Sequence, residues 1–302
     1  MSSSAPLHIE GVYTPIVAPF SADDSIDFDT YGKVIEFNLS AGIAGLVACG
    51  TTGEYYAMTF DERVQVMTHT RDINDGRATI VAGCNAGSTK EVIQYGHVAR
   101  DLGYDAVMLA APHTSLPTQR ELAAHYLAVA DAVGIPVILY NYPARAGVEI
   151  GYDCLDAIVD HPGIVAIKES SGDFSRFLQL RKRYSDRLTI MCGSDDQAVD
   201  YFSWGVGSWL AGTANILPRH HVAAMNAANS GNLAAAYAIF DGILPWVQNM
   251  ESGSYNAKAK AGLRYQGIEC GHVRPPLLAL EAETEMELLR VLKLALDTPL
   301  NG

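Results

Sequence analysis

The fold of this chain is decided around the stretch Ile164-Val165-Ala166-Ile167-Lys168-Glu169-Ser170-Ser171-Gly172. Its apolar, largely β-branched first half predicts a buried strand, and its polar second half marks the end of that strand. Asp173 then stands in an N-cap position before a segment with helical spacing at Phe174–Tyr184. The stretch therefore predicts a strand–turn–helix unit with a lysine at the carboxyl end of its strand.

The same unit recurs along most of the chain. Short apolar runs occur at Val12–Val17, Gly45–Ala48, Thr79–Ala82, Ala106–Ala110, Val137–Tyr140, Val165–Ile167, Leu188–Met191 and Ser208–Ala211. Segments with helical spacing separate them, at Phe28–Leu39, Thr59–Ile73, Thr89–Leu102, Gln119–Val133, Cys154–Val159, Phe174–Tyr184 and Gln197–Trp204. Eight such units in about 220 residues favour an α/β fold of the closed (β/α)8 type, a TIM barrel, over a doubly wound sheet.

The last part of the chain has a different pattern. The strand pattern ceases from about Pro218 onward, and helical segments follow, including Leu233–Gln248, Tyr255–Tyr265 and Thr284–Leu296. We therefore expect residues 8–230 to form the barrel and residues 231–302 to form a C-terminal helical extension of the same domain. This extension is expected to pack on the outside of the barrel or in an interface between subunits.

Composition excludes several classes of function. The 302 residues, 49% hydrophobic and 18% charged, are typical of a globular protein with a large core, and no run approaches the roughly 20 apolar residues of a membrane helix. A net charge of −13 without a cluster of Lys and Arg argues against a nucleic-acid partner. The start, Met1–Pro6, has neither the basic nor the apolar region of a signal peptide, and the five cysteines lack metal-ligand spacing. We expect a cytoplasmic protein with reduced thiols and no membrane partner.

Lys168 is the residue that most needs a chemical explanation. Burying an ammonium group costs several kcal/mol or more unless the group is paired or loses its proton. A neutral lysine amine is a nucleophile that forms a Schiff base with a ketone carbonyl. The alternative is a structural ion pair with a carboxylate such as Glu169, and the lysine alone leaves both interpretations open.

Polar residues and glycines gather where the predicted strands end, which is where barrel enzymes build their active sites. They form the segments Gly50–Glu54, Tyr140–Arg145, Lys168, Gly193–Asp196 and Gly212–Asn215. A phenol at Tyr140 suits proton transfer, although a core tyrosine bonded to the backbone is the alternative interpretation. The Gly50-Thr51-Thr52-Gly53 turn offers N–H groups and hydroxyls to a carboxylate.

From Gly11 to about Leu296, the chain resembles the dihydrodipicolinate synthase and N-acetylneuraminate lyase superfamily of class I, Schiff-base-forming lyases. The resemblance is carried by Gly50–Glu54, Tyr140–Arg145 and Lys168-Glu169, in this order and with these separations. It implies that Lys168 forms a Schiff base with a 2-keto acid and that Tyr140 shuttles protons. It further implies that the Thr51-Thr52 turn receives the substrate carboxylate and that the main chain near Leu210 lines the pocket. A homo-oligomer, a tetramer or a dimer, is implied as well, and neither a metal ion nor a cofactor is expected.

Departures from the family pattern bear on the substrate. Thr114 stands where the synthase branch has a relay tyrosine, next to His113, and Tyr55 follows the glycine-threonine turn. Arg145 matches the arginine that orders the second substrate in that branch, and the alternative is that it holds the distal polar end of a sugar acid. We expect a lyase acting on a small 2-keto acid: an aldolase, a dehydratase of a 2-keto-3-deoxy sugar acid, or a deaminase of a hydroxypyrroline carboxylate. The alternatives are a genuine synthase condensing pyruvate with aspartate semialdehyde, and a non-catalytic barrel that binds a keto acid.

Overall fold

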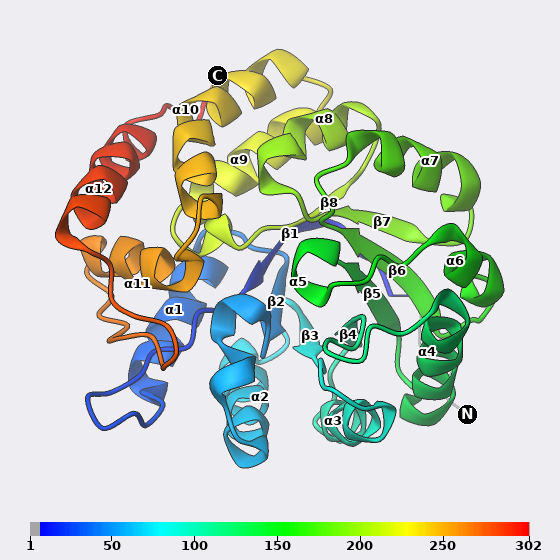
Figure 1. Ribbon diagram of the computed structural model, residues 1–302. Coiled ribbons are helices and arrows are strands. Elements are labelled where there is room, and N and C mark those ends of the chain that lie inside the picture. The colour runs from blue at the N-terminus through cyan, green and yellow to red at the C-terminus, as the bar shows by residue number, and fades with distance from the viewer. Residues whose placement is uncertain (1–6, 302) are drawn as a thin grey trace.

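The computed structural model describes residues 7–301, so the expected lead-in Met1–Pro6 lies outside the described residues. The chain forms a closed barrel of parallel strands in which the order around the barrel follows the sequence and β8 closes on β1 (Figure 1). The strands are β1 Gly11–Pro15, β2 Gly45–Ala48, β3 Thr79–Gly83, β4 Ala106–Ala110, β5 Val137–Asn141, β6 Ile164–Glu169, β7 Thr189–Cys192 and β8 Ser208–Leu210. The predicted (β/α)8 barrel is confirmed.

Helices form the outer ring of the barrel (Figure 1). They are α1 Phe28–Ser40, α2 Phe60–Asn74, α3 Thr89–Asp101, α4 Gln119–Val133, α6 Tyr152–Ile158, α7 Phe174–Tyr184, α8 Ala198–Ser203 and α9 Pro218–Asn229. The Asp173 side chain accepts the N–H groups of Ser175 and Arg176, so the cap predicted before α7 is present. One short helix was not expected: α5, Pro143–Ala146, begins with a proline, which suits a first helical turn.

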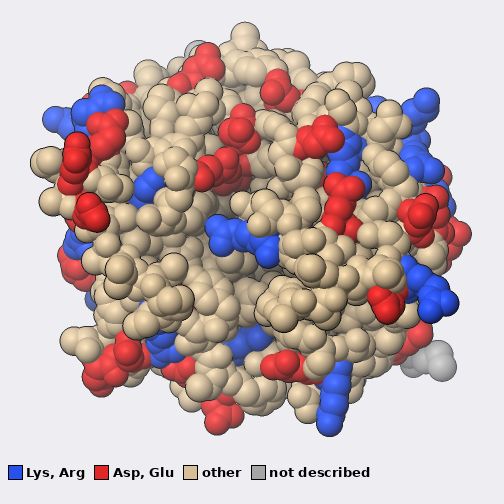
Figure 2. All heavy atoms as spheres, viewed as in Figure 1, with Lys and Arg blue, Asp and Glu red and all other residues tan. Residues whose placement is uncertain are grey.

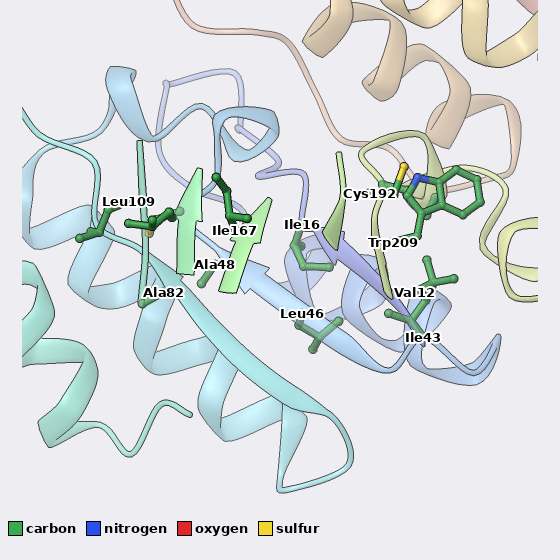
Figure 3. Close-up of a cluster of buried hydrophobic side chains, with 14 of the residues drawn as sticks. Val12, Ile16, Ile43, Leu46, Ala48, Ala82, Leu109, Ile167, Cys192 and Trp209 are labelled. Atoms are coloured by element: carbon green, nitrogen blue, oxygen red, sulfur yellow. The ribbon is translucent and has the colours of Figure 1, made fainter. Parts of the chain in front are cut away.

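Side chains from the barrel strands form two separate cores. One fills the inside of the barrel and includes Tyr13, Val81, Met108 and Ala166. The other lies between strands and helices and includes Ile167 (Figure 3). Because successive side chains of a strand point to opposite faces, Ala166 and Lys168 belong to the inside and Ile167 and Glu169 to the outside. The sequence of β6 thus directs the lysine into the barrel mouth.

The C-terminal helices are α10 Leu233–Glu251, α11 Tyr255–Tyr265 and α12 Ala282–Leu296. Helix α10 packs against α9 and α12. The C-terminal helices α10, α11 and α12 lie together at one side of the barrel (Figure 1). The expected division at residues 230 and 231 falls in the turn between α9 and α10, and we propose to keep it as a description of one packed domain. Within residues 7–301, none of the helices has the length and apolar character needed to cross a membrane.

Candidate active site

Lys168 lies at the carboxyl end of β6, with its side chain inside the barrel and only 7% exposed. It lines a cavity of about 320 Å³ at the barrel mouth. Tyr140 is its register partner on β5, and the lysine Nζ lies 4.4 Å from the centre of the tyrosine ring. Gly193 is required beside them, because a Cβ atom there would lie 2.7 Å from the lysine Cε.

The neighbouring carboxylate does not neutralise this lysine. Glu169 is fully buried on the outer face of β6, where it accepts hydrogen bonds from Arg176 Nε at 3.0 Å and Asn141 Nδ2 at 3.0 Å. No ion pair of Lys168 is present within residues 7–301. The interpretation of Lys168 as half of an ion pair with Glu169 is therefore wrong, since consecutive strand residues face opposite ways.

Burial determines the protonation of the two central groups. It lowers the pKa of Lys168 from 10.5 to about 8, against the opposing influence of Asp195, and it raises the pKa of Tyr140 above its ordinary value. About a tenth of the lysine is therefore neutral at pH 7, compared with well under a thousandth for an exposed lysine. The site thus combines an available amine nucleophile with a phenol that keeps its proton.

Asp195 belongs to a buried chain of hydrogen bonds beneath the cavity. Its carboxyl group contacts Trp209 Nε1 at 2.9 Å and Thr213 Oγ1 at 2.8 Å. The same Thr213 oxygen lies 2.8 Å from His221 Nε2, and His221 Nδ1 lies 2.8 Å from the carbonyl oxygen of Leu217.

Counting protons along this chain constrains its charge. The carbonyl of Leu217 only accepts, so His221 Nδ1 carries a proton. The Thr213 hydroxyl has one proton, which it donates either to His221 Nε2 or to the Asp195 carboxyl group. Whichever of these two groups does not receive it must itself carry a proton and donate it to the Thr213 oxygen. Burial lowers the pKa of His221 to about 3 and raises that of Asp195, and both directions favour a proton on the Asp195 side of this chain. Any negative charge that remains on Asp195 raises the pKa of Lys168, against the effect of burial.

The structure brings together every site residue predicted from the sequence. Thr51 and Thr52 form the short helix η1 (Thr51–Gly53), Leu210 ends β8, and Arg145 lies on α5; all of them line the cavity with Lys168 and Tyr140. Arg145 is exposed, with its guanidinium 5.4 Å from the centre of the Tyr142 ring. Figure 2 shows this face hollowed, with Lys and Arg atoms in its middle and Asp and Glu atoms close by.

A second cavity of about 310 Å³ adjoins the first and shares Thr51, Tyr140 and Arg145 with it. Tyr55 and His113 line this second cavity. Thr114 lines neither cavity; it lies exposed on the rim with a φ of 75°, a strained conformation for a β-branched residue. Within residues 7–301, no group of three His, Cys, Asp or Glu side chains is arranged to hold a metal ion.

Sequence reasoning missed the contribution of the C-terminal extension to the cavity. The end of α10 and the start of α11 add Glu251, Ser254, Tyr255 and Asn256 to its wall. The local sequence carries no signal for this, because these residues reach the cavity only through the packing of the extension on the barrel.

Comparisons with known proteins agree over almost the whole chain. The sequence model of the Dihydrodipicolinate synthetase family matches residues 8–295. The 4-hydroxy-tetrahydrodipicolinate synthase of an Exiguobacterium species is 33% identical over 94% of this chain and 97% of its own, and that of Pseudomonas aeruginosa is 32% identical over 94% and 98%.

Solved structures agree with the sequence matches. The 4-hydroxy-tetrahydrodipicolinate synthase of Methylacidiphilum fumariolicum superposes with a TM-score of 0.93 at 28% identity, over 96% of this chain and 97% of that one. The dihydrodipicolinate synthase of Acinetobacter baumannii, solved in complex with pyruvate, gives a TM-score of 0.92 at 31% identity, over 95% and 99%.

Proposed function

The chain belongs to the dihydrodipicolinate synthetase family of class I, lysine Schiff-base lyases, and we propose that it acts on a small 2-keto acid through Lys168. The observation that carries this proposal is the buried amine, whose pKa is lowered to about 8 and which has no ion-pair partner within residues 7–301. Pyruvate is the simplest such acid, and it is bound in the solved Acinetobacter baumannii relative.

The chemistry of the site follows from these groups. The neutral amine of Lys168 adds to the ketone carbon C2, and loss of water from the resulting carbinolamine gives a protonated imine. The imine withdraws electrons from C2, so the C–H or C–C bond at C3 breaks and its electron pair is taken up as an enamine. Tyr140, protonated and next to the lysine, supplies and recovers the protons of these steps. The Thr51-Thr52 turn receives the carboxylate.

Two kinds of reaction use this intermediate. We favour cleavage, dehydration or deamination of a larger 2-keto acid, because Thr114 offers no phenol and lies outside both cavities. The second candidate is condensation of pyruvate with aspartate semialdehyde. It is supported by the names of the relatives and by Arg145, a cation at the cavity that suits the carboxylate of a second substrate.

Borohydride trapping tests the shared step. The purified protein is reduced in the presence of pyruvate, and we expect the mass of the reduced pyruvate adduct on the peptide containing Lys168. The exposed Lys182 serves as the internal control and should remain unmodified. A protein that acquires no adduct at Lys168 would contradict the proposal. A panel of 2-keto acids and cyclic imines, assayed for release of pyruvate, ammonia or a semialdehyde, then separates the two candidates.

We also propose that the protein is a cytoplasmic homo-oligomer, a tetramer or a dimer. Several apolar side chains of the C-terminal region are exposed, among them Leu278 at 81% and Met286 at 66%, which suits burial in a subunit interface. The cysteines at positions 49, 84, 154, 192 and 270 are free and buried, which suits a reducing compartment. A monomeric mass by light scattering at micromolar concentration would contradict the oligomer.

A further inference from the structure

Tyr255 enters the cavity from outside the barrel. It is the first residue of α11, and its side chain lines the same cavity as Lys168 and Tyr140. None of the steps assigned to those two residues uses it.

The phenol of Tyr255 lies against the proposed carboxylate turn. A Cβ atom placed on Gly212 would lie 2.2 Å from the Tyr255 Oη and 3.2 Å from the Thr52 Oγ1. The two hydroxyl groups therefore both lie close to the same point of the cavity wall. Glycine is needed at position 212 because any side chain would occupy the place of the phenol.

Several contacts hold Tyr255 in this place. Asn256 Nδ2 donates to the carbonyl oxygen of Thr51 at 3.1 Å and to the Tyr56 hydroxyl at 2.9 Å. One turn further along α11, Lys260 forms a buried ion pair with Glu54 at 2.8 Å. The start of α11 is thus fixed to both sides of the Thr51–Gly53 turn, so a rigid element positions the phenol.

The backbone directly before α11 is strained, and this strain also helps to position Tyr255. The residue before the helix, Ser254, has a φ of 50°, a left-handed conformation that is costly for a residue with a side chain. It follows Gly253, whose φ is 123°. This sharp connection turns the first residue of α11 toward the cavity.

The Tyr255 hydroxyl is a donor without an acceptor. Within residues 7–301 it makes no hydrogen bond, although the neighbouring Asn256 and Thr52 are buried and the side chain itself is only partly accessible. Burial raises the pKa of Tyr255 well above its ordinary value, so the phenol keeps its proton. A partly buried hydroxyl that faces a cavity favours a ligand with an acceptor at that point.

We infer that the Tyr255 hydroxyl donates a hydrogen bond to the carboxylate of the 2-keto acid bound at Lys168, together with the Thr52 hydroxyl. This inference rests on the proposed function and adds a residue from the C-terminal extension to the substrate site. Tyr255 thereby selects keto acids over ketones that lack a carboxylate.

The test compares two ketones that differ in this group. Initial rates of borohydride trapping are measured at subsaturating pyruvate and hydroxyacetone, which carries a hydroxymethyl group in place of the carboxylate. Tyr255→Phe should slow the trapping of pyruvate about tenfold, the loss expected for a hydrogen bond to a charged group, and that of hydroxyacetone less than about twofold. Gly212→Ala, which displaces the phenol, should give the same pattern.

The matched control is Tyr265→Phe, the same change at the exposed end of the same helix, which should leave both rates unchanged. Thermal unfolding of each variant checks that the fold is intact. Equal losses for the two ketones, or no loss for pyruvate, would overturn the inference while leaving the Schiff base in place. A wild-type protein that traps neither ketone would instead contradict the proposed function, and the inference with it.

Discussion

Tyr140 and Lys168 are direct partners across β5 and β6, and the lysine Nζ lies 4.4 Å from the centre of the tyrosine ring. Both side chains are set by the hydrogen-bond ladder between two neighbouring strands of the barrel, and neither depends on a loop. The proposed nucleophile and the proposed proton carrier therefore keep one geometry whether or not the surrounding loops move.

Replacement of the lysine should remove catalysis and leave the fold intact. Lys168→Ala removes the nucleophile, and Lys168→Arg replaces it with a guanidinium that stays protonated. We expect both purified variants to show less than a few per cent of the wild-type turnover and no borohydride adduct. Measurable turnover above that level in either variant, with normal circular dichroism, would rule out the Schiff-base assignment.

Removal of the Tyr140 hydroxyl should slow turnover strongly. Tyr140→Phe keeps the ring and deletes only the proton carrier, so we expect a loss on the order of 10²–10⁴ in kcat, the range for a positioned acid–base group. Thr114→Ala, at an exposed rim position, is the comparison and should cost far less. If Thr114→Ala proves as damaging as Tyr140→Phe and the wild type condenses pyruvate with aspartate semialdehyde, the biosynthetic interpretation is the correct one.

The pH dependence of trapping should report the pKa of Lys168. Only the neutral amine reacts, so the rate with pyruvate should rise with pH and level off above about pH 8, because burial lowers that pKa to about 8. An ordinary lysine would continue to gain rate up to about pH 10.

Asp195→Asn tests the proton count beneath the cavity. If Asp195 carries a proton, an asparagine amide reproduces its contacts by donating to Thr213 and accepting from Trp209, and the pH profile should move by less than about half a pH unit. A fall of the apparent pKa by a full unit or more would show that Asp195 is charged in the wild-type protein, because the loss of a nearby negative charge destabilises the ammonium form.

Chelation should leave the rate unchanged. Iminium chemistry needs no divalent ion, and within residues 7–301 no cluster of three metal-ligating side chains is present. The measurement is turnover before and after EDTA treatment. Strong inhibition that a divalent metal reverses would place the lysine mechanism in doubt.

The sequence allowed the barrel and most of the cavity to be predicted, because both rest on short-range patterns. Alternation along β6 predicts which way Lys168 points, and polar residues after strand ends predict which turns meet. Tyr255 escaped prediction because its approach to Gly212 depends on how a separate set of helices packs. The role of Asp195 escaped for a similar reason, since its proton count depends on His221, which is contributed by α9.

The place of Tyr255 also has a consequence for how the protein is made. The ribosome completes all eight strands before it adds the start of α11, so a nascent barrel carries Lys168 in a mouth that still lacks one wall. A chain cut short after α9 would lack Glu251, Ser254, Tyr255 and Asn256, which complete the cavity wall. The order of synthesis thus delays the finished binding site until the chain is nearly complete.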